Sequence, residues 1–153
     1  MCPLFPSWNG IVPNINRALT SLDLRRNEIG AGGAEAIAGS LLQSALKRLV
    51  INMELDIEQL KTHISIHLER KGLRAEEAII VAKCIEFNRA LKSANLSNNK
   101  IGDEGTAALS KALKTNSTLE TLELRSKLTS LYLDGNKIGA GGAKAIAAAL
   151  PQS

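Results

Sequence analysis

Apolar and polar residues alternate in three short segments of the chain, and each segment leads into a turn and an alanine-rich stretch. The segments begin at Leu19, Leu91 and Leu128 and share the pattern L-x-x-(L/A)-x-L-x-x-N-x-I-G-x-x-G-(A/T). Alternation with a period of two is typical of a strand with one buried face. Apolar residues spaced i, i+3, i+4 and i+7 after the glycines predict helices. Each copy therefore predicts a strand, a turn and a helix, and successive strands should run parallel.

The turn of each copy contains residue types with a physical purpose. An asparagine stands where the chain leaves the strand, and its amide can donate and accept hydrogen bonds to turn backbone that stacking would bury. These residues are Asn27, Asn99 and Asn136. A glycine that allows a tight or positive-φ turn before the helix follows at Gly30, Gly102 and Gly139. A second glycine, at Gly33, Gly105 and Gly142, suits close approach of helix to strand.

The spacing of the copies indicates a stacked array with two defects. A weaker copy begins at His63, with Lys71 in place of the asparagine, and the starts His63, Leu91 and Leu119 lie 28 residues apart. One copy cannot bury its own apolar residues, so neighbouring copies must stack. The segment 46–62 is too short for a full copy, and the strands predicted at 119–124 and 128–133 are too close for a parallel crossover of about a dozen residues. Either these two strands form a hairpin, or one of the two copies is displaced from the stack. We favour displacement of 119–127.

We therefore divide the chain into a cap-like N-terminal segment, 1–18, and a repeat array, 19–153. The array has starts near 19, 46 (truncated), 63, 91, 119 (truncated) and 128. The last helix ends at Leu150, before Pro151, and no polar capping unit follows it. Terminal repeats normally need a polar outer face. We expect the C-terminal flank to self-associate or to be covered by another copy.

Composition narrows the choice of partner and compartment. Aromatic residues make up 3% of the chain, so its core must be aliphatic. The net charge of +4 is spread along the sequence without a basic cluster, which argues against a nucleic-acid partner. No apolar run approaches the ~20 residues of a membrane span, and the N-terminus has no basic leader. Cys84 lies in an apolar helical pattern and is interpreted as a small buried residue. We expect a cytoplasmic protein without a membrane anchor.

Candidate catalytic and metal-binding groups are sparse. His63 and His67 lie four residues apart, but the frame places His63 at an apolar strand position and His67 on the opposite side, and no third ligand is fixed nearby. Ser93, Ser97 and Ser130 have no positioned histidine and acid. The Gly-Ala-Gly-Gly runs lack the order of a phosphate-binding loop. The sequence therefore predicts no metal, no cofactor and no enzyme activity.

The Asn-x-Ile-Gly-x-x-Gly pattern resembles the ribonuclease-inhibitor-like leucine-rich repeats. Such repeats occur in ribonuclease inhibitors, in the C-terminal arrays of NOD-like receptors and in Ran GTPase-activating protein. The resemblance implies an α/β leucine-rich-repeat solenoid, a short horseshoe with parallel strands on the concave face and helices on the convex face. It further implies a non-catalytic module that binds a protein partner.

The side chains at the variable strand positions should face away from the helices and form the binding surface. The candidates are Asp23, Arg25, Arg26, His67, Glu69, Arg70, Asn95, Ser97, Tyr132 and Asp134. Tyr and Arg often carry the energy of protein interfaces. Two alternatives remain open: a regulator of an enzyme (a GTPase activator or a ribonuclease inhibitor) acting through the same face, or a truncated array without independent function. A GTPase activator would present an arginine, for which Arg25 and Arg125 are candidates.

Overall fold

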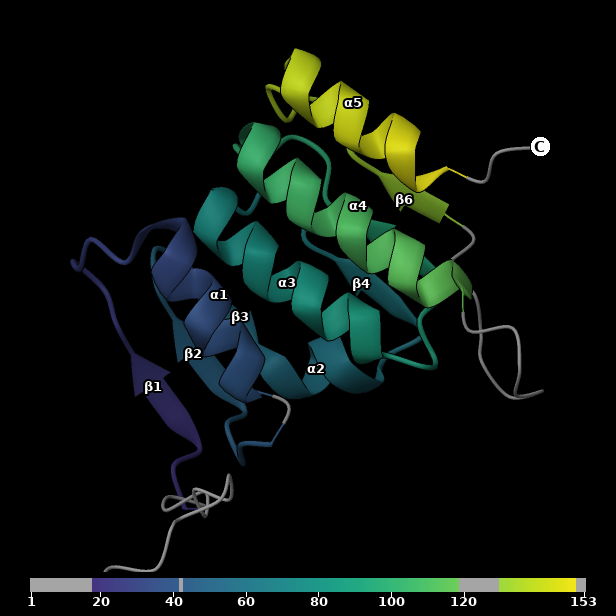
Figure 1. Cartoon of the computed structure of the whole chain (residues 1–153). Helices are drawn as coiled ribbons and strands as arrows, with labels where there is room; N and C mark the ends of the chain where they lie inside the picture. Colours follow the sequence, from purple (N-terminus) through teal and green to yellow (C-terminus); the bar gives the residue numbers. More distant parts are fainter. Residues whose placement is uncertain (1–17, 42, 119–129, 151–153) are drawn as a thin grey trace, which may run out of the picture.

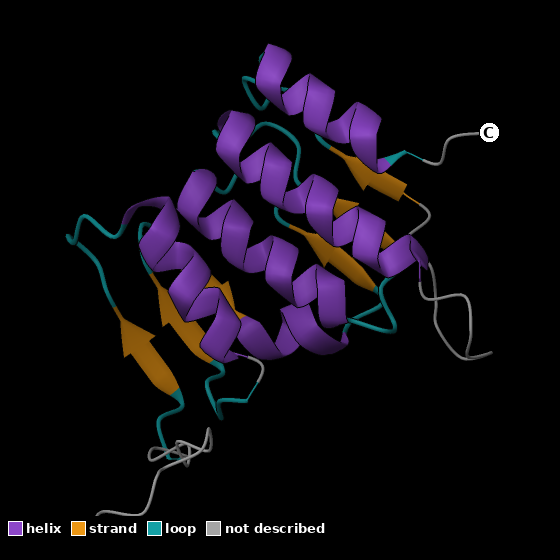
Figure 2. Cartoon of the chain, in the orientation of Figure 1, coloured by secondary structure: helices purple, strands orange, loops and turns teal. Residues whose placement is uncertain are grey.

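Strands and helices alternate along most of the chain and form two layers, with the strands on one side and all but one of the helices on the other (Figure 1, Figure 2). The computed structural model describes residues 18–41, 43–118 and 130–150, without the side chains of 116–118. The predicted cap-like segment, apart from residue 18, and the displaced copy predicted at 119–127 lie outside the described residues.

Each of the three clear copies contains the predicted elements. The first half of the described chain carries β1 (Ser21–Asp23), α1 (Gly30–Leu41), β2 (Arg48–Val50), β3 (Glu54–Asp56) and α2 (Ile57–Thr62). The second half carries β4 (Ser65–His67), α3 (Ala75–Phe87), β5 (Ser93–Asn95), α4 (Gly102–Thr118), β6 (Ser130–Tyr132) and α5 (Ala140–Ala149). The strand-turn-helix order of the copies that begin at Leu19, Leu91 and Leu128 is therefore confirmed.

The strands form two small sheets. The first sheet has the order β1-β2-β3, and the second has the order β4-β5-β6. All strands of the second sheet are parallel, and their register places Ile66, Ala94 and Leu131 side by side. β6 pairs directly with β5, so the copy that begins at Leu128 stacks on the copy that begins at Leu91.

The segment 46–62 departs from the predicted repeat. β2 runs parallel to β1, but β3 runs antiparallel to β2, with Leu49 opposite Leu55. The Ile51 N–H donates to the Met53 carbonyl (3.2 Å) and closes the turn between them. The expectation that all successive strands run parallel is therefore wrong here. Three residues separate β2 from β3, and a parallel connection needs about a dozen or more.

Most of the helices form one continuous layer. α1 packs on α3, α3 on α4 and α4 on α5, side by side (Figure 1). α2 has six residues and packs against α3 and β2 instead of filling a place between α1 and α3. The helix layer is therefore continuous across the truncated copy, although the strands beneath it form two separate sheets.

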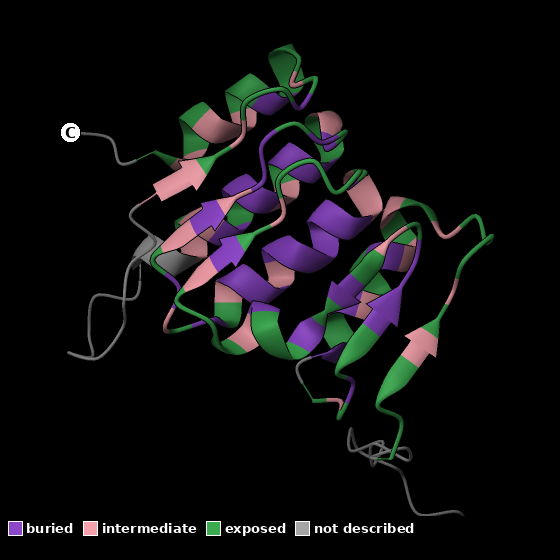
Figure 3. Ribbon diagram, turned by 180° about the vertical axis from the view of Figure 1, so that it is seen from behind, coloured by how far each residue is buried: buried purple, intermediate pink, exposed green. Residues whose placement is uncertain are grey.

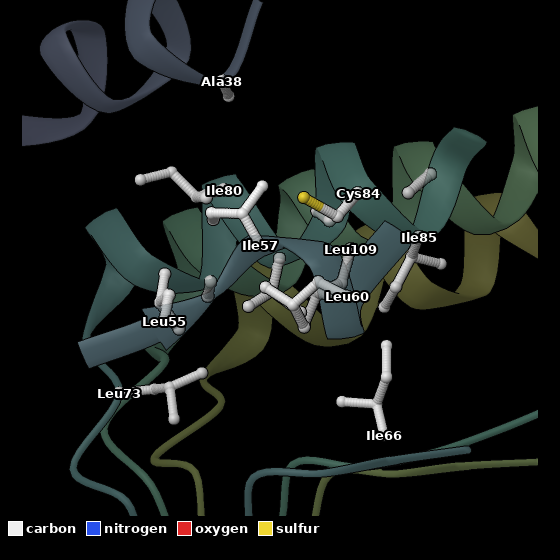
Figure 4. Packing of buried hydrophobic residues seen from close by; sticks show 14 of the residues in the cluster. Ala38, Leu55, Ile57, Leu60, Ile66, Leu73, Ile80, Cys84, Ile85 and Leu109 are labelled. Carbon is white, nitrogen blue, oxygen red and sulfur yellow. The ribbon is translucent and has the colours of Figure 1, made fainter. Parts of the chain in front are cut away.

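The core lies between the layers and is centred on α3. Ile80 and Ile85 of α3 meet Leu60 of α2, Ile66 of β4 and Leu109 of α4 in one buried cluster (Figure 4). This cluster consists of Leu, Ile, Ala, Val and Cys side chains, as the low aromatic content predicts. Figure 3 shows the burial concentrated at α3 and the central strands, with exposed residues at both ends of the stack. Full burial of one such aliphatic side chain contributes about 1.5–3 kcal/mol.

The start of the weak copy also differs from the prediction. His63 does not fill an apolar strand position: it is the exposed C-cap of α2, and its N–H donates to the Gln59 carbonyl (3.1 Å). Ile64, the next residue, is 61% exposed. The prediction for His63 is wrong because α2 continues to Thr62, so His63 ends this helix and does not begin the strand.

Candidate interaction surface

The second sheet presents a row of polar and aromatic side chains on the side away from the helices. Ile66 and Ala94 are buried against the core, so the alternate residues of these strands face the other way. The parallel register places His67 beside Asn95, and Asn95 beside Tyr132. Tyr132 is 54% exposed. We call this side of β4, β5 and β6 the open strand face.

Hydrogen bonds between neighbouring repeats organise the rim of this face, where the chain leaves the strands. The Asn95 amide donates to Glu69 (3.3 Å), and the Asn98 amide donates to Asp134 (3.4 Å). The Ser97 hydroxyl also donates to the Asp134 carboxylate. Ser97 is 5% exposed, so its contribution is to position Asp134 rather than to offer its own surface.

The same turn position adopts a left-handed backbone in four repeats. It is occupied by Arg26 (φ 62°), Arg70 (φ 55°), Asn98 (φ 57°) and Gly135 (φ 66°). This conformation costs a residue with a Cβ about 1–2 kcal/mol. Arg70 is exposed, and its guanidinium lies 3.5 Å from Glu69. The turn therefore fixes the backbone positions of Arg26 and Arg70 at the edge of each sheet.

The first sheet carries a separate group of charges. Arg25 forms a 2.7 Å ion pair with Asp23, and Arg48 forms a 2.8 Å ion pair with Glu54. Hydrogen bonds from Arg25 lower the pKa of Asp23, and a hydrogen bond from Arg48 lowers the pKa of Glu54. Arg48 also donates to the Ser21 hydroxyl (3.1 Å). Asp23, Arg25 and Arg26 line an open hollow with residues of the β2–β3 turn.

The predicted binding residues thus fall into two groups. Asp23, Arg25 and Arg26 belong to the first sheet, and the other seven belong to β4, β5, β6 and the turns that follow them. Among the described strands, none of the first sheet pairs with a strand of the second. Sequence reasoning did not identify Arg48 and Glu54. The signal for Arg48 was available, because in the truncated copy that starts at Leu46 it occupies the variable position that Ser21 holds in the first copy.

Of the three turn asparagines, Asn99 both donates to and accepts from turn backbone, as the sequence predicts. The Asn99 side-chain oxygen accepts three backbone N–H groups, from Lys71, Gly72 and Leu73, at 2.9–3.1 Å. Its nitrogen donates to the carbonyl of Leu68 in the preceding copy and to two carbonyls of its own turn. Asn136 likewise donates to Leu96 of the preceding copy (2.8 Å). These amides connect consecutive turns and hold the repeats in register.

The turn glycines follow the prediction at two of three positions. Gly30 and Gly102 have φ values of 60° and 63°. Gly139 does not have a positive φ: its φ is −92°, and Lys137 takes the left-handed conformation in that copy. Gly139 donates its N–H to Asp103 (2.6 Å), and a Cβ there would lie 3.1 Å from that carboxylate. A close approach, rather than a positive φ, accounts for this glycine.

The second glycine of each copy makes a different close approach from the one expected. A Cβ on Gly105 would lie 2.8 Å from the Ala78 Cβ on α3 and 2.7 Å from Ile101 in its own turn. A Cβ on Gly142 would lie 3.2 Å from Thr106 on α4. The nearest neighbours are therefore the turn isoleucine and the preceding helix, rather than a strand.

Two buried polar residues that organise the fold were missed. Glu77 is fully buried, and it accepts hydrogen bonds from the Arg74 N–H and from Asn52 in the β2–β3 turn. Asn88 ends α3 and donates to the carbonyls of Leu60 and His63. Glu77 had a sequence signal, because an acid three residues after the start of a helix often caps the backbone. Asn88 had no such signal in the repeat pattern.

The described residues do not form a metal centre. His67 Nε2 lies 3.2 Å from the Ser65 hydroxyl, and His63 caps α2. Within the described ranges, no three His, Cys, Asp or Glu residues cluster in a way that could hold a metal ion. Cys84 is buried, and desolvation raises the pKa of its thiol to about 11. The interpretation of Cys84 as a small buried residue is therefore confirmed.

Comparison with known families identifies the repeating unit. Residues 16–38, 87–110 and 125–147 match the family model described as Leucine Rich repeat. The family model thus finds leucine-rich repeats in three places along the chain. A search of curated proteins finds no match. Leucine-rich-repeat domains generally mediate protein–protein interaction and are typically non-catalytic. Among the helices that the structure describes, none is both long and apolar enough to cross a membrane.

Proposed function

We propose that the chain is a non-catalytic protein-binding module and that the partner binds the open strand face of the second sheet. In the horseshoe that ribonuclease-inhibitor-like repeats form, this face would be the concave side. The observation that carries the proposal is the parallel row His67–Asn95–Tyr132, which is bordered by Glu69, Arg70 and Asp134.

The chemistry of this row suits a protein partner. Tyr132 offers a rigid and exposed aromatic ring, and such residues are enriched where interfaces gain most of their energy. The surrounding groups can donate and accept hydrogen bonds, which suits the polar rim of an interface. Inter-repeat bonds already fix Asn95 and Asp134, so less side-chain entropy is lost on binding.

The first sheet is less suited to this task. Arg25 is held by Asp23 through hydrogen bonds of its Nε (2.9 Å) and Nη2 (2.7 Å), so Asp23 occupies one edge of its donor fork. A GTPase activator would need a free guanidinium to reach a bound nucleotide. Arg125, the other candidate, lies outside the described residues. The geometry around Arg25 therefore favours a binding module over an activator.

Affinity capture with matched variants tests the proposal. Tyr132→Ala removes the exposed ring, and the double variant Glu69→Arg/Arg70→Glu exchanges the two charges at the rim. The control, Asp23→Arg/Arg25→Glu, makes the same exchange on the first sheet. Both exchanges conserve net charge. Bound proteins are quantified by mass spectrometry against the unaltered chain.

We expect both second-sheet variants to retain about tenfold less of the captured proteins, since truncating an interface Tyr commonly costs more than 1 kcal/mol. The first-sheet control should retain them. Equal capture by all four proteins would rule out the strand face. Loss with the first-sheet variant alone would place binding on the other sheet and contradict the proposal.

A further inference from the structure

The last repeat exposes a flank that the same chain buries in its first repeat. Residues 128–147 and 19–38 are nearly the same sequence, and three residues on one side of α5 align with three on α1: Ala143 with Ala34, Ala147 with Ala38, and Leu150 with Leu41. In the first repeat α3 packs on this side, and Leu41 is 2% exposed. In the last repeat Leu150 is 57% exposed, and Ala143 and Ala147 are exposed as well. This flank of α5 therefore has the residues that contact a neighbouring helix in the first repeat, but here no described helix covers it.

The first repeat exposes the complementary flank. Gly142 of α5 packs against Thr106 of α4, and its counterpart in α1 is Gly33. Further along the same side of α1 lie Ala36 and Ser40, both exposed and small. β1 and β6 are the outer strands of their sheets within the described residues, and each pairs on one side. Among the described residues, each end of the stack thus carries one half of the joint that connects the interior repeats.

Charged residues at the two ends have opposite signs at aligned positions. Equivalent residues of stacked repeats lie side by side, as the register Ser93↔Ser130 illustrates. Three exposed residues of the last repeat would face three residues of the first: Asp134 opposite Arg25, Lys137 opposite Glu28, and Lys144 opposite Glu35. Such pairs give an association its specificity and its sensitivity to salt.

Asn27, the turn asparagine of the first repeat, has no described hydrogen bond of the kind that its counterparts make to the preceding copy. Asn99 and Asn136 donate to a carbonyl of the preceding copy, Leu68 and Leu96 respectively. The described bonds of Asn27 go to Leu24 and Arg25 in its own turn. By alignment, the Leu133 carbonyl of another chain would complete the pattern.

We propose that copies of this chain stack head to tail, with α5 of one copy on α1 of the next and β6 parallel to β1. Because this joint uses two different flanks, it does not close on itself and gives open-ended oligomers. The row His67–Asn95–Tyr132 stays uncovered, and of the residues that border it only Asp134 takes part in the joint, so this inference can fail or hold separately from the proposed partner-binding function.

Sedimentation velocity of the full chain across a wide concentration range tests the inference. The first variant, Lys137→Glu/Lys144→Glu, makes both ends acidic, and the second, Glu28→Lys/Glu35→Lys, makes both ends basic. Lys71→Glu/Lys111→Glu is the control, because it changes net charge as the first variant does but at exposed positions of interior repeats. Circular dichroism verifies that each variant is folded.

We expect the mass of the unaltered chain to rise with concentration beyond that of a dimer and to fall with added salt. Each end variant alone should weaken association about tenfold or more, while the control should not. An equimolar mixture of the two end variants should restore association, because each then meets an oppositely charged end. A monomer at every concentration overturns the inference. So does a plateau at a dimer, or an association that Glu28→Lys/Glu35→Lys leaves unchanged, since a tail-to-tail pair does not use α1.

Discussion

The carboxylate of Glu77 holds the turn of Asn52, which lies 25 residues earlier in the chain. One oxygen accepts the Asn52 backbone N–H (2.9 Å) and its side-chain amide (3.0 Å), and the other accepts the Arg74 N–H at the start of α3 (2.9 Å). A fully buried carboxylate is stable when its oxygens receive such bonds. This contact attaches the irregular β2–β3 hairpin to the regular repeat that follows it.

We predict that Glu77→Gln lowers the free energy of unfolding by about 1–3 kcal/mol, because the amide –NH₂ would face N–H donors and lose their hydrogen bonds. The control is Glu76→Gln, one residue earlier and partly exposed, which should change it by less than about 0.5 kcal/mol. Urea denaturation followed by circular dichroism measures both. Equal effects of the two substitutions would show that Glu77 has no special role.

Asn99 and Asn27 occupy the same repeat position but should differ in their contribution to stability. Asn99→Ala leaves the N–H groups of Lys71, Gly72 and Leu73 without an acceptor, so we expect a loss of about 3 kcal/mol or more. Asn27→Ala removes two bonds within an exposed turn and should cost less than about 1 kcal/mol. Thermal melting compares them. A cost at Asn27 equal to that at Asn99 would contradict the role assigned to inter-repeat bonding.

Glycine substitutions test the close packing of α3 on α4. Gly105→Ala places a methyl group 2.8 Å from the Ala78 Cβ and should destabilise the protein by about 1–3 kcal/mol. Gly32→Ala, in α1, meets open space and should stabilise it by about 0.5 kcal/mol, because alanine favours the helix. Denaturant midpoints of the two variants should therefore shift in opposite directions. A neutral Gly105→Ala would mean that the two helices are farther apart than described.

The ion pair on the first sheet predicts a titration behaviour. Hydrogen bonds from Arg25 hold the pKa of Asp23 below its ordinary value in the folded chain. The pair therefore contributes to stability above the unfolded-state pKa of Asp23, and this contribution is lost as the pH falls through the lower folded-state pKa. NMR titration of the Asp23 carboxyl carbon should report a lowered pKa, and Arg25→Gln should raise it. An unchanged pKa in the variant would show that the pair does not form in solution.

Much of the fold follows from the repeat pattern. The copies at Leu19, Leu91 and Leu128 predict their strand, turn and helix correctly, because period-two alternation and helical spacing are local properties. The asparagine bonds were also predictable, since stacking buries turn backbone that needs partners. The same alternation predicts which residues lie on the open strand face. It does not predict which of them lie side by side on neighbouring strands, because the register is set by packing between repeats.

The irregular segment was predicted less well because the repeat frame concealed a local signal. Leu49 and Ile51 alternate on one side of Asn52, and Leu55 and Ile57 alternate on the other, which is the pattern of a hairpin with a short turn. The division into two sheets follows from that hairpin. The Asn52–Glu77 bond could not be predicted, because it joins two segments whose relative placement depends on how α1 reaches α3.

The nuclear Overhauser effects between neighbouring strands test the stacking of the repeats most directly. We predict contacts between the backbone protons of Ile66 and Ala94 and between those of Ala94 and Leu131, in the pattern of parallel strands. These contacts place His67, Asn95 and Tyr132 in one row. Their absence, or a strand other than β4 or β6 beside β5, would contradict both the stacked sheet and the surface built on it.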